Sequence, residues 1–529
     1  MSDYDVVIAG GSHNGLACGA FLSLHGLTVL VAERNDWVGG GAVTAEITLP
    51  GFKHDLFGAS HVWCHVNPDF RNVLRPELEK NYGLKYLWSE DDITGHPMPE
   101  GPGIVIYKSV DKTCDSLARY SKSDAMRYRE IFDDFKEIEN GFVKGFFSPP
   151  NPPSYHLAAM ENSEEGLRML RDYHLSAAAF VEENFENKWV RSAILGWAMG
   201  PHVKPHQEGM GASFYIMIPA MHVYGQSIPE GGSMQLPLSC KRLIEDKGGT
   251  VLTNSTIEQF IVSNGECRGI RLQDGTEIIG RQAVITALDP VQTFTRLIDP
   301  VHLDGKFIRM CRNFRFGDIG IFRVHYALED APDFNNGGDM NKVAYHRIFG
   351  PVQDVVNHFA EVDKKQLPMD PFIHSLCWTV KDPGRAPDGR HCLTIDTFPP
   401  TELAGNVKWD DVKEDYARVL LAVLRRHTRN MDDANILDYK IHTPEDLYAY
   451  NRSFYKGSPT GGDRVMSQLG FFRPVPGYSQ YKSPIKKLYM TGPSCHPGGG
   501  ISAMGTITAR VVLQELGLIA GEDDDADFL

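Results

Sequence analysis

The chain has 529 residues, of which 42% are hydrophobic and 23% are charged, and its formal net charge is −15. A chain of this length is expected to form more than one domain, and the composition is ordinary for a globular enzyme. The acidic charge argues against a nucleic-acid partner, because binding phosphates needs a basic face. Residues 521–529 contribute part of that charge and are predicted to be a solvated, disordered tail.

The nine cysteines favour a reducing, intracellular compartment. Their number is odd and no CxxC pair occurs, so we expect neither a disulfide framework nor a metal site. Asp3 and Asp5 do not suit a signal peptide, and no apolar run approaches the roughly 20 residues that span a bilayer. The sequence therefore predicts a cytoplasmic protein that at most makes peripheral contact with a membrane.

Residues 4–33 predict a strand, a glycine turn, a helix and a second strand in that order. The apolar run at 6–9 leads into GGSHNG at 10–15, and the second apolar strand at 28–32 ends on Glu33. This order is typical of a βαβ unit that holds a dinucleotide at the carboxyl end of its first strand. The predicted nucleotide contacts are Gly10, Gly11, Ser12, His13, Asn14, Gly15, Glu33 and Arg34.

Each position in this motif has a chemical reason. Gly10 tolerates a positive φ at the sharp exit from the strand, and Gly15 and Gly19 let the helix approach the sheet. The amides of residues 11–15 are expected to face a pyrophosphate, assisted by the helix dipole. Glu33 can accept both hydroxyls of a ribose. Ser12 replaces the usual second glycine, but its hydroxyl can still donate to a phosphate.

The dinucleotide predicted by the rest of the chain is FAD. No second nucleotide-binding unit occurs, so a separate NAD(P)H domain has no place. Two further glycine clusters, at 39–41 before Ala42 and at 498–500 before a predicted helix, suggest backbone close to a long cofactor. Taken singly, each cluster could be no more than a tight turn.

Other segments indicate an α/β fold. Residues 251–290 alternate apolar and polar residues around Asn264-Gly265 and Asp274-Gly275, which suit hairpins. Residues 111–200 are mostly helical in pattern, and 486–518 predict a strand, a glycine turn and a helix.

These motifs resemble the phytoene desaturase-like flavoproteins, within the carotenoid desaturase and FAD-dependent amine oxidase superfamily. The resemblance runs in order along nearly the whole chain, and its end motifs are the most specific. It rests on HNGL (13–16), VGGGAVT (38–44), PGFKHDL (50–56), PEGGSMQLP (229–237), VITALDP (284–290), FFRPVPG (471–477) and TGPSCHPGGGISAMG (491–505).

The resemblance implies a Rossmann-like FAD-binding domain of the glutathione-reductase type and a discontinuous substrate domain of mixed sheet and helices. The implied FAD-binding segments are 1–75, 226–300 and 471–520, and the implied substrate-binding segments are 76–225 and 301–470. It also implies cofactor contacts for Gly39, Gly40, Gly41, Ala42, Thr256, Ile257, Gly492, Gly499, Gly500 and Ile501. No arginine follows Gly40 as in typical amine oxidases, which places the chain on the desaturase side.

Candidate catalytic residues are His496, beside the last glycine cluster, and His61, since a histidine can act as a base near neutral pH. Cys495 could carry a covalent flavin, although a small buried residue is the simpler interpretation. The candidate substrate cavity comprises Trp63, Tyr215, Met217, Met221 and Tyr224, because methionine adapts to irregular ligands. Ordinary core packing would explain these five residues equally well.

The leading hypothesis is an FAD-dependent oxidoreductase that takes hydride from an elongated, largely apolar small molecule. Its flavin would be reoxidised by O2, a quinone or another acceptor. One alternative is a redox-neutral isomerase or a saturase of isoprenoid-type substrates. Another is a non-catalytic binding protein, like the escort proteins of prenylated GTPases that share this fold.

Overall fold

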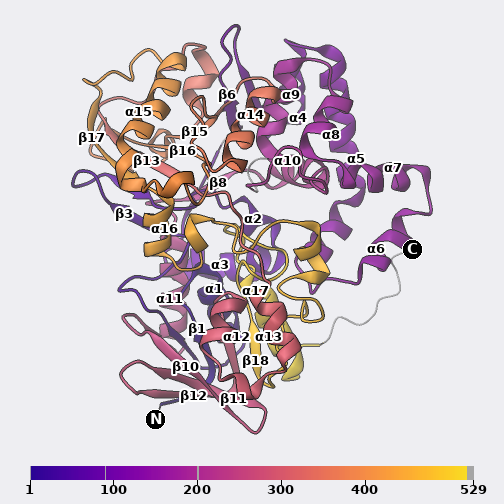
Figure 1. The fold of residues 1–529 in the computed structure, drawn as a ribbon, viewed down its shortest axis with the longest axis vertical. Coiled ribbons are helices and arrows are strands. Elements are labelled where there is room, and N and C mark those ends of the chain that lie inside the picture. The colour runs from indigo at the N-terminus through magenta and orange to yellow at the C-terminus, as the bar shows by residue number, and fades with distance from the viewer. Residues whose placement is uncertain (1, 90, 199–201, 521–529) are drawn as a thin grey trace.

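Two seven-stranded sheets organise the part of the chain that the structure describes, residues 2–89, 91–198 and 202–520 of a computed structural model. Figure 1 shows the first sheet in the lower half of the molecule and the second at the upper left, beside a helical region. The predicted tail at 521–529 lies outside the described residues.

The first sheet has the order β10-β11-β12-β1-β2-β9, with β18 pairing with β12. β1 lies between β12 and β2 and is parallel to both. Its residues Val6 to Ala9 are completely buried, as expected for a central strand covered on both faces. The strands are β1 (Ser2–Ala9), β2 (Val29–Ala32), β9 (Thr250–Leu252), β10 (Ile257–Ser263), β11 (Glu266–Leu272), β12 (Glu277–Thr286) and β18 (Leu488–Met490).

This sheet has a topological switch point at β1. The chain passes from β1 to β2 on one side, whereas β12 lies on the other side and pairs with β18. Ligands of open α/β sheets bind outside the carboxyl ends of the strands at such a point. Those ends are marked by Gly10 after β1, Glu33 after β2 and Thr491 after β18.

The predicted hairpins at 251–290 are confirmed. β10 and β11 are antiparallel, and Ser263 pairs with Glu266 across the two-residue turn Asn264-Gly265. Both turn residues have positive φ, 51° and 75°, which is the backbone conformation that Asn-Gly hairpin turns require. β11 and β12 pair in the same way around Gly275.

The second sheet has the order β17-β13-β16-β15-β14-β6-β7 and is antiparallel except between β14 and β6. Two short antiparallel pairs, β3 with β4 and β5 with β8, lie outside both sheets. The strands are β3 (Thr44–Glu46), β4 (Lys53–Asp55), β5 (Tyr86–Trp88), β6 (Asp92–His96), β7 (Ile104–Tyr107), β8 (Ser227–Pro229), β13 (Phe322–Leu328), β14 (Tyr345–Ile348), β15 (Ile373–Leu376), β16 (His391–Thr397) and β17 (Ile436–His442).

The helices follow the predicted pattern, with a bundle in the middle of the chain. α1 packs against both α11 and α17, so helices from three distant segments lie together beside the first sheet. They are α1 (His13–Leu24), α2 (Val62–Val66), α3 (Arg75–Asn81), α4 (Val110–Ala118), α5 (Lys122–Phe146), α6 (Pro153–Met160), α7 (Glu164–His174), α8 (Ala177–Asn184), α9 (Lys188–Ala198), α10 (Ala212–Tyr224), α11 (Gln235–Asp246), α12 (Pro290–Arg296), α13 (Gly305–Arg312), α14 (Val352–Asp363), α15 (Trp409–His427), α16 (Pro444–Tyr450) and α17 (Gly505–Glu515).

Strands of the first sheet come from three separated stretches of sequence, near the N-terminus, at 250–286 and at 488–490. The division into domains at the stated boundaries stays a prediction. All nine cysteines are free thiols, and eight of them are buried. None of the described helices is both long enough and apolar enough to cross a membrane.

Candidate functional site

The turn after β1 has the shape predicted for a nucleotide-binding loop. Gly10 has φ +107°, and a Cβ built on Gly15 would lie only 2.3 Å from the carbonyl oxygen of Gly10. Ser12 caps α1, because its Oγ accepts a hydrogen bond from the Gly15 amide at 3.2 Å. A serine therefore keeps the turn in place where the usual motif has a glycine, and its hydroxyl hydrogen remains available to a ligand.

Glu33 lies directly beside this turn. Its Oε2 accepts from the Gly11 amide at 2.8 Å, and its Oε1 accepts from the Asn35 amide at 3.0 Å. A Cβ on Gly11 would lie 2.8 Å from the Glu33 Cβ, so only glycine permits this approach. Burial raises the pKa of the Glu33 carboxyl, and the two amides oppose that rise.

The second glycine cluster packs onto the first turn. The Gly39 amide donates to the Gly11 carbonyl at 2.8 Å, and the His13 amide donates to the Gly39 carbonyl at 3.0 Å. Gly40 has φ +61°, and a Cβ there would lie 2.7 Å from the Ser12 Cβ. The two glycine clusters are thus adjacent, held together by backbone hydrogen bonds and close contacts.

The C-terminal glycine turn lies against the other two glycine turns. We call the region where the turns at 10–15, 39–41 and 498–501 meet the glycine cradle. The buried His13 ring places Nδ1 3.2 Å from the Gly39 carbonyl and Nε2 3.4 Å from the Gly500 carbonyl. A Cβ on Gly505, at the start of α17, would lie 1.9 Å from the Asn14 carbonyl. Residues nearly 490 positions apart therefore meet, and His13 links the two turns.

The remaining predicted cofactor contacts lie around this cradle or at its margin. Ser255 donates its amide to the Glu33 carbonyl at 2.7 Å, which puts Thr256 and Ile257 beside the acidic residue. The exposed Arg34 donates to the Ala449 and Tyr450 carbonyls at the end of α16. Three further residues were predicted: Ala42 donates its amide to the Gly39 carbonyl, Gly492 packs against Ala287, and Ile501 lies beside Gly58.

The backbone amides at 11–15 are less available than the sequence predicted. Those of Gly11, His13 and Gly15 already donate to Glu33, Gly39 and Ser12. The Asn14 side chain differs from them, since it is completely buried and neither its Oδ1 nor its Nδ2 has a hydrogen-bond partner. A buried amide without partners is costly, so a polar ligand that bonds it is expected here.

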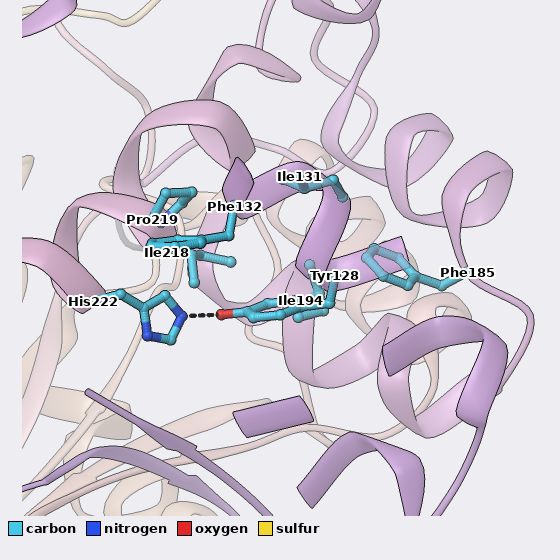
Figure 2. Close-up of a pocket in the computed structure, with 8 residues that line it drawn as sticks. All are labelled: Tyr128, Ile131, Phe132, Phe185, Ile194, Ile218, Pro219 and His222. Atoms are coloured by element: carbon cyan, nitrogen blue, oxygen red, sulfur yellow. Dashed lines mark hydrogen bonds between the residues drawn. The ribbon is translucent and has the colours of Figure 1, made fainter. Parts of the chain in front are cut away.

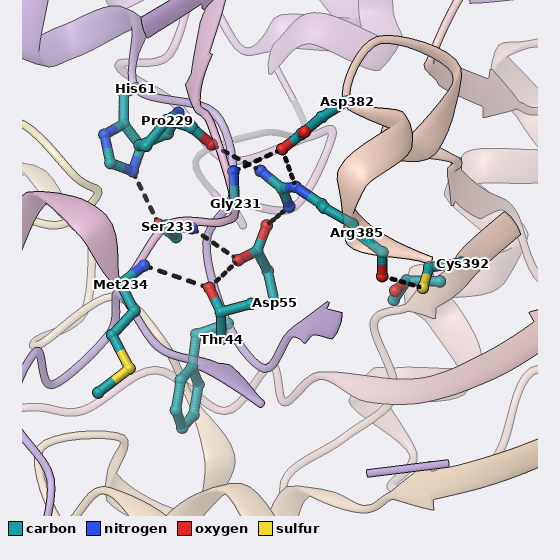
Figure 3. A network of polar contacts seen from close by, with 12 residues as sticks. Thr44, Asp55, His61, Pro229, Gly231, Ser233, Met234, Asp382, Arg385 and Cys392 are labelled. Carbon is teal, nitrogen blue, oxygen red and sulfur yellow. Dashed lines mark hydrogen bonds and ion pairs between the residues drawn. The ribbon is translucent and has the colours of Figure 1, made fainter. Parts of the chain in front are cut away.

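His61 lies in a network of buried polar groups, shown in Figure 3. Its Nε2 is 2.7 Å from the Ser233 Oγ, and its Nδ1 is 3.0 Å from the Tyr86 hydroxyl. Burial lowers the pKa of His61 to about 3, so the ring is neutral. Both ring nitrogens are engaged within the protein, and a catalytic role for His61 stays a prediction.

The same network joins the β3–β4 pair to the segment between β15 and β16 and to the turn before α11. Asp55 accepts from the Thr44 hydroxyl at 2.6 Å and from the Ser233 amide at 2.8 Å, and it pairs with Arg385 at 2.5 Å. Arg385 also pairs with Asp382 at 2.7 Å and is 1% exposed (Figure 3). This ion pair between distant segments fixes the segment that leads into Gly58.

An aromatic group lies between α5 and the C-terminal motif. Phe146 stacks on Trp63 with 5.2 Å between ring centroids, and its edge meets the His496 ring at 5.9 Å. Phe142 lies 5.1 Å from Phe146. All four side chains are only partly buried, so they form an apolar surface beside the last glycine turn. The structure thus brings the predicted residues His496 and Trp63 together.

The other predicted cavity residues lie farther along the helical region. Tyr224 donates to Glu139 at 2.9 Å and lies under the Arg71 guanidinium, whereas Met217 is half-buried on α10 and Met221 is buried. The side chain of Tyr215 lies outside the described residues. The cavity role of this set stays a prediction.

The helices around α10 enclose little space. A cavity of about 10 Å³ lies there, lined by eight side chains that include Tyr128 and His222 (Figure 2). The Tyr128 hydroxyl is 2.5 Å from the His222 Nε2. A space of this size holds about one water molecule.

A row of polar residues that sequence reasoning missed crosses the second sheet. His442, Arg323, Asp396, His374 and Arg347 occupy directly opposed positions on five adjacent strands, and each is at most 6% exposed. Directly opposed residues share one face of a sheet. That face looks toward the cradle, because Arg323 donates to the Phe57 carbonyl at 2.5 Å. The sequence offered one signal for this row, namely charged or histidine residues inside apolar strands. Which of these residues lie opposite one another depends on the pairing register of the strands, which the sequence does not specify.

Within this polar row the charges are unequal. Arg323 makes a bidentate pair with Asp396, both contacts at 2.5 Å. Arg347 instead lies over the Trp197 ring at 4.0 Å and the Tyr345 ring at 4.9 Å, donates to the Gly196 carbonyl, and keeps a buried Nε without a partner. Arg347 pairs with no carboxylate among the residues that the structure describes.

Comparisons with known proteins agree with this geometry. Residues 8–76 match the family model described as an NAD(P)-binding Rossmann-like domain. The chain is 27% identical to one of the subunits of limonene dehydrogenase from Castellaniella defragrans, over 97% of this chain and 95% of that protein. It is 24% identical to a lycopene-forming phytoene desaturase of a Paracoccus species, over 96% and 97%. Over nearly its whole length the chain is thus similar to dehydrogenases and phytoene desaturases.

Solved structures agree with the fold of this chain. Cyclohexylamine oxidase from Brevibacterium oxydans superposes with a TM-score of 0.58 at 14% identity, over 97% of this chain and 100% of that one. The predicted α/β fold with a Rossmann-like domain is confirmed. The relatives that match along nearly the whole chain are dehydrogenases and desaturases, which supports the prediction of an oxidoreductase.

Proposed function

We propose that this chain is an FAD-dependent dehydrogenase or desaturase that removes hydride from an elongated, largely apolar organic molecule. The observation that carries the proposal is the single cradle formed where the turn after β1 meets the turn before α17 at His13. Two glycine turns from opposite ends of the chain suit a long cofactor with a nucleotide at one end and a ring at the other.

The residues of the cradle fit FAD. Glu33 would accept the ribose hydroxyls, while the Ser12 hydroxyl and the unpartnered Asn14 amide would bind the pyrophosphate, against which Gly40 has no side chain to intrude. The turn at 499–501 would lie along the ribityl chain and the flavin ring. FAD, when bound, would supply the two-electron acceptor for the substrate's hydride, and O2, a quinone or another acceptor would reoxidise it.

The aromatic group supplies an apolar wall beside that turn. Trp63, Phe142 and Phe146 would hold the apolar body of the substrate by excluding water from it. His496 meets the edge of Phe146, where its ring could accept a proton that leaves together with the hydride. Limonene and phytoene, in the names of the similar enzymes, are apolar molecules of this kind.

The purified protein tests the proposal directly. We expect a yellow sample that absorbs near ~450 nm and that bleaches when mixed anaerobically with a substrate. A protein that stays colourless after reconstitution with FAD would rule out a flavoenzyme. Turnover without bleaching would instead indicate the redox-neutral isomerase that remains the alternative.

Stopped-flow reduction tests the role of His496. We expect His496→Ala to slow flavin reduction by about 10²-fold, the usual contribution of a general base. His222→Ala is the matched control, because His222 is a buried histidine of the helical region that bonds Tyr128. Equal rates in His496→Ala and the wild type would remove His496 from the mechanism.

A further inference from the structure

A cavity of about 170 Å³ adjoins the C-terminal glycine turn. Two of its lining groups define its position: the Thr460 carbonyl lies 3.0 Å, and the Arg464 Nη2 lies 3.4 Å, from a Cβ built on Gly499. The cavity therefore opens beside the turn that we propose to hold the flavin ring. Its lining includes His202, Lys204, Arg315, Asp318, Asp463 and Arg464.

The positively charged side chains that line this cavity differ in their carboxylate partners. Lys204 pairs with Asp318 at 2.8 Å and with Asp363 at 2.6 Å, and Arg315 pairs with Asp463 at 3.0 Å. Asp318 and Asp363 are largely exposed, so water screens much of their charge.

Arg464 is the exception. Within the described part of the chain it pairs with no carboxylate, and its buried Nε has no hydrogen-bond partner. Burial lowers the pKa of Arg464 to about 10, which still leaves it charged at neutral pH. A buried charge without a counter-ion is strongly unfavourable, whereas a buried cation with an anion in contact is not.

Arg464 is partly buried, and three arginines that are at most 6% exposed have partners. Arg385 has two carboxylates, Arg323 has one, and Arg473 donates to the carbonyls of Thr460 and Pro493. Arg473 adds to the positive charge beside Arg464, since after burial the nearby Arg464 is the largest cause that lowers the pKa of Arg473 to about 9. This interior contains more cations than anions.

The positive region continues from the cavity to the polar row. The His202 ring lies edge-on to the Phe398 ring, with 4.7 Å between the ring centroids. The His374 ring of the polar row contacts the same Phe398 ring, with 5.0 Å between centroids. Beyond His374 lies Arg347, which is buried and also pairs with no carboxylate among the described residues. Burial and the charges of Arg464, Arg323 and Arg347 lower the pKa of His202 to about 3, so this ring adds no charge of its own.

We propose that the cavity beside Arg464 binds a carboxylate or a similar oxyanion at one end of the substrate. The substrate class is then an organic acid with an apolar body, whereas a pure hydrocarbon would leave the Arg464 guanidinium unpaired. The cavity is large enough for such an end group, because a cavity of about 150 Å³ accommodates a benzene ring. This inference deepens the proposed function and rests on it.

Calorimetric titration of the purified protein, with the FAD it retains, tests the site with two probes of nearly equal shape. Benzoate carries the carboxylate, and benzamide carries a neutral amide in its place. We expect benzoate to bind at least about tenfold more tightly, because losing one partner of a desolvated charge pair costs that much or more. Equal affinities for the two probes would overturn the proposal.

Three variants locate the effect. Arg464→Met should weaken benzoate binding at least about tenfold, and Arg464→Lys should keep part of the affinity, since it keeps the charge but loses the planar fork. Arg315→Met is the matched control, because Arg315 lines the same cavity but already pairs with Asp463. Equal losses in Arg464→Met and Arg315→Met would contradict a specific anion site.

Two further readouts separate this inference from the proposed function. If Arg464→Met lost FAD, measured by flavin absorbance per protein, Arg464 would serve the cofactor and the substrate proposal would fail. A colourless protein that still binds benzoate would refute the flavoenzyme and keep the anion site. For an oxidisable acid and its methyl ester, Arg464→Met should raise the KM for the acid at least about tenfold and raise the KM for the ester much less.

Discussion

Buried polar groups are paired differently in two regions of the molecule. One region is the glycine cradle, where the turns at 10–15, 39–41 and 498–501 meet. The other is the interior beside the second sheet. In the cradle, backbone amides, Glu33 and His13 mostly bond each other, and close backbone contacts leave room only for glycine. In the second sheet Arg347 has no carboxylate among the described residues, and neither has Arg464 of the cavity beside the cradle. The first region is organised by local backbone geometry, whereas the charges of the second are paired unequally.

The largest expected effect follows from filling the cradle. Gly15→Ala places a Cβ 2.3 Å from the Gly10 carbonyl, so the backbone of the turn must move. We expect a loss of about 3 kcal/mol or more in unfolding free energy and no retained FAD, measured by denaturation and by flavin absorbance. Gly141→Ala is the control, since a Cβ at this position in α5 meets open space. A Gly15→Ala protein with wild-type stability would break the comparison.

The second effect concerns the buried ion pairs of Arg385 with Asp55 and Asp382. Arg385→Met leaves the carboxylates of Asp55 and Asp382 buried without their cation, and we expect unfolding free energy to fall by about 3–5 kcal/mol. Arg390→Met removes an exposed pair with Glu329 and should cost less than about 1 kcal/mol. Urea denaturation measures both variants. Equal losses would mean that the buried network adds nothing to stability.

The third effect concerns Glu33 and pH. Burial raises the pKa of this carboxyl, so acidification protonates it before an ordinary glutamate, and the protonated group accepts ribose hydroxyls poorly. FAD affinity of the wild type should therefore fall as pH falls through that raised pKa. Glu33→Gln should weaken FAD by about tenfold at pH 7 and lose the acid-side dependence. Fluorescence titration at several pH values checks this, and an unchanged pH profile in the variant would contradict it.

The smallest effect is expected at Ser12. Ser12→Gly restores the usual glycine but removes the side-chain cap on Gly15, and exchanging such a cap for glycine costs only a few tenths of a kcal/mol. FAD affinity should fall by about threefold, because the hydroxyl that we propose to bind the pyrophosphate is lost while the turn keeps its shape. Ser12→Ala should destabilise by about 1 kcal/mol, because alanine has neither the cap nor the flexibility. An FAD affinity in Ser12→Gly equal to that of the wild type would contradict a contact between the hydroxyl and the cofactor.

The difference between the two regions also explains which features could be predicted from the sequence. The turn at 10–15, Glu33, and the hairpins at Asn264-Gly265 and Gly275 follow from local spacing and from residues that tolerate a positive φ. The polar row was not predicted, because its members come from five strands that are far apart in sequence and are aligned only by register. Arg464 carried no motif, and its lack of an acid partner depends on which side chains surround it.

By itself, the sequence determined that the chain contains a nucleotide-binding βαβ unit, that its fold is α/β, and that its two ends carry glycine turns able to approach a cofactor. These features depend on the chain's immediate neighbours, through backbone sterics and hydrophobic periodicity. Only the tertiary structure decided that His13 joins the two turns, that His61 is neutral and fully hydrogen-bonded, and that a positive interior faces the cradle. Burial and pairing of charges are properties of three-dimensional neighbours, which residue spacing along the chain does not specify.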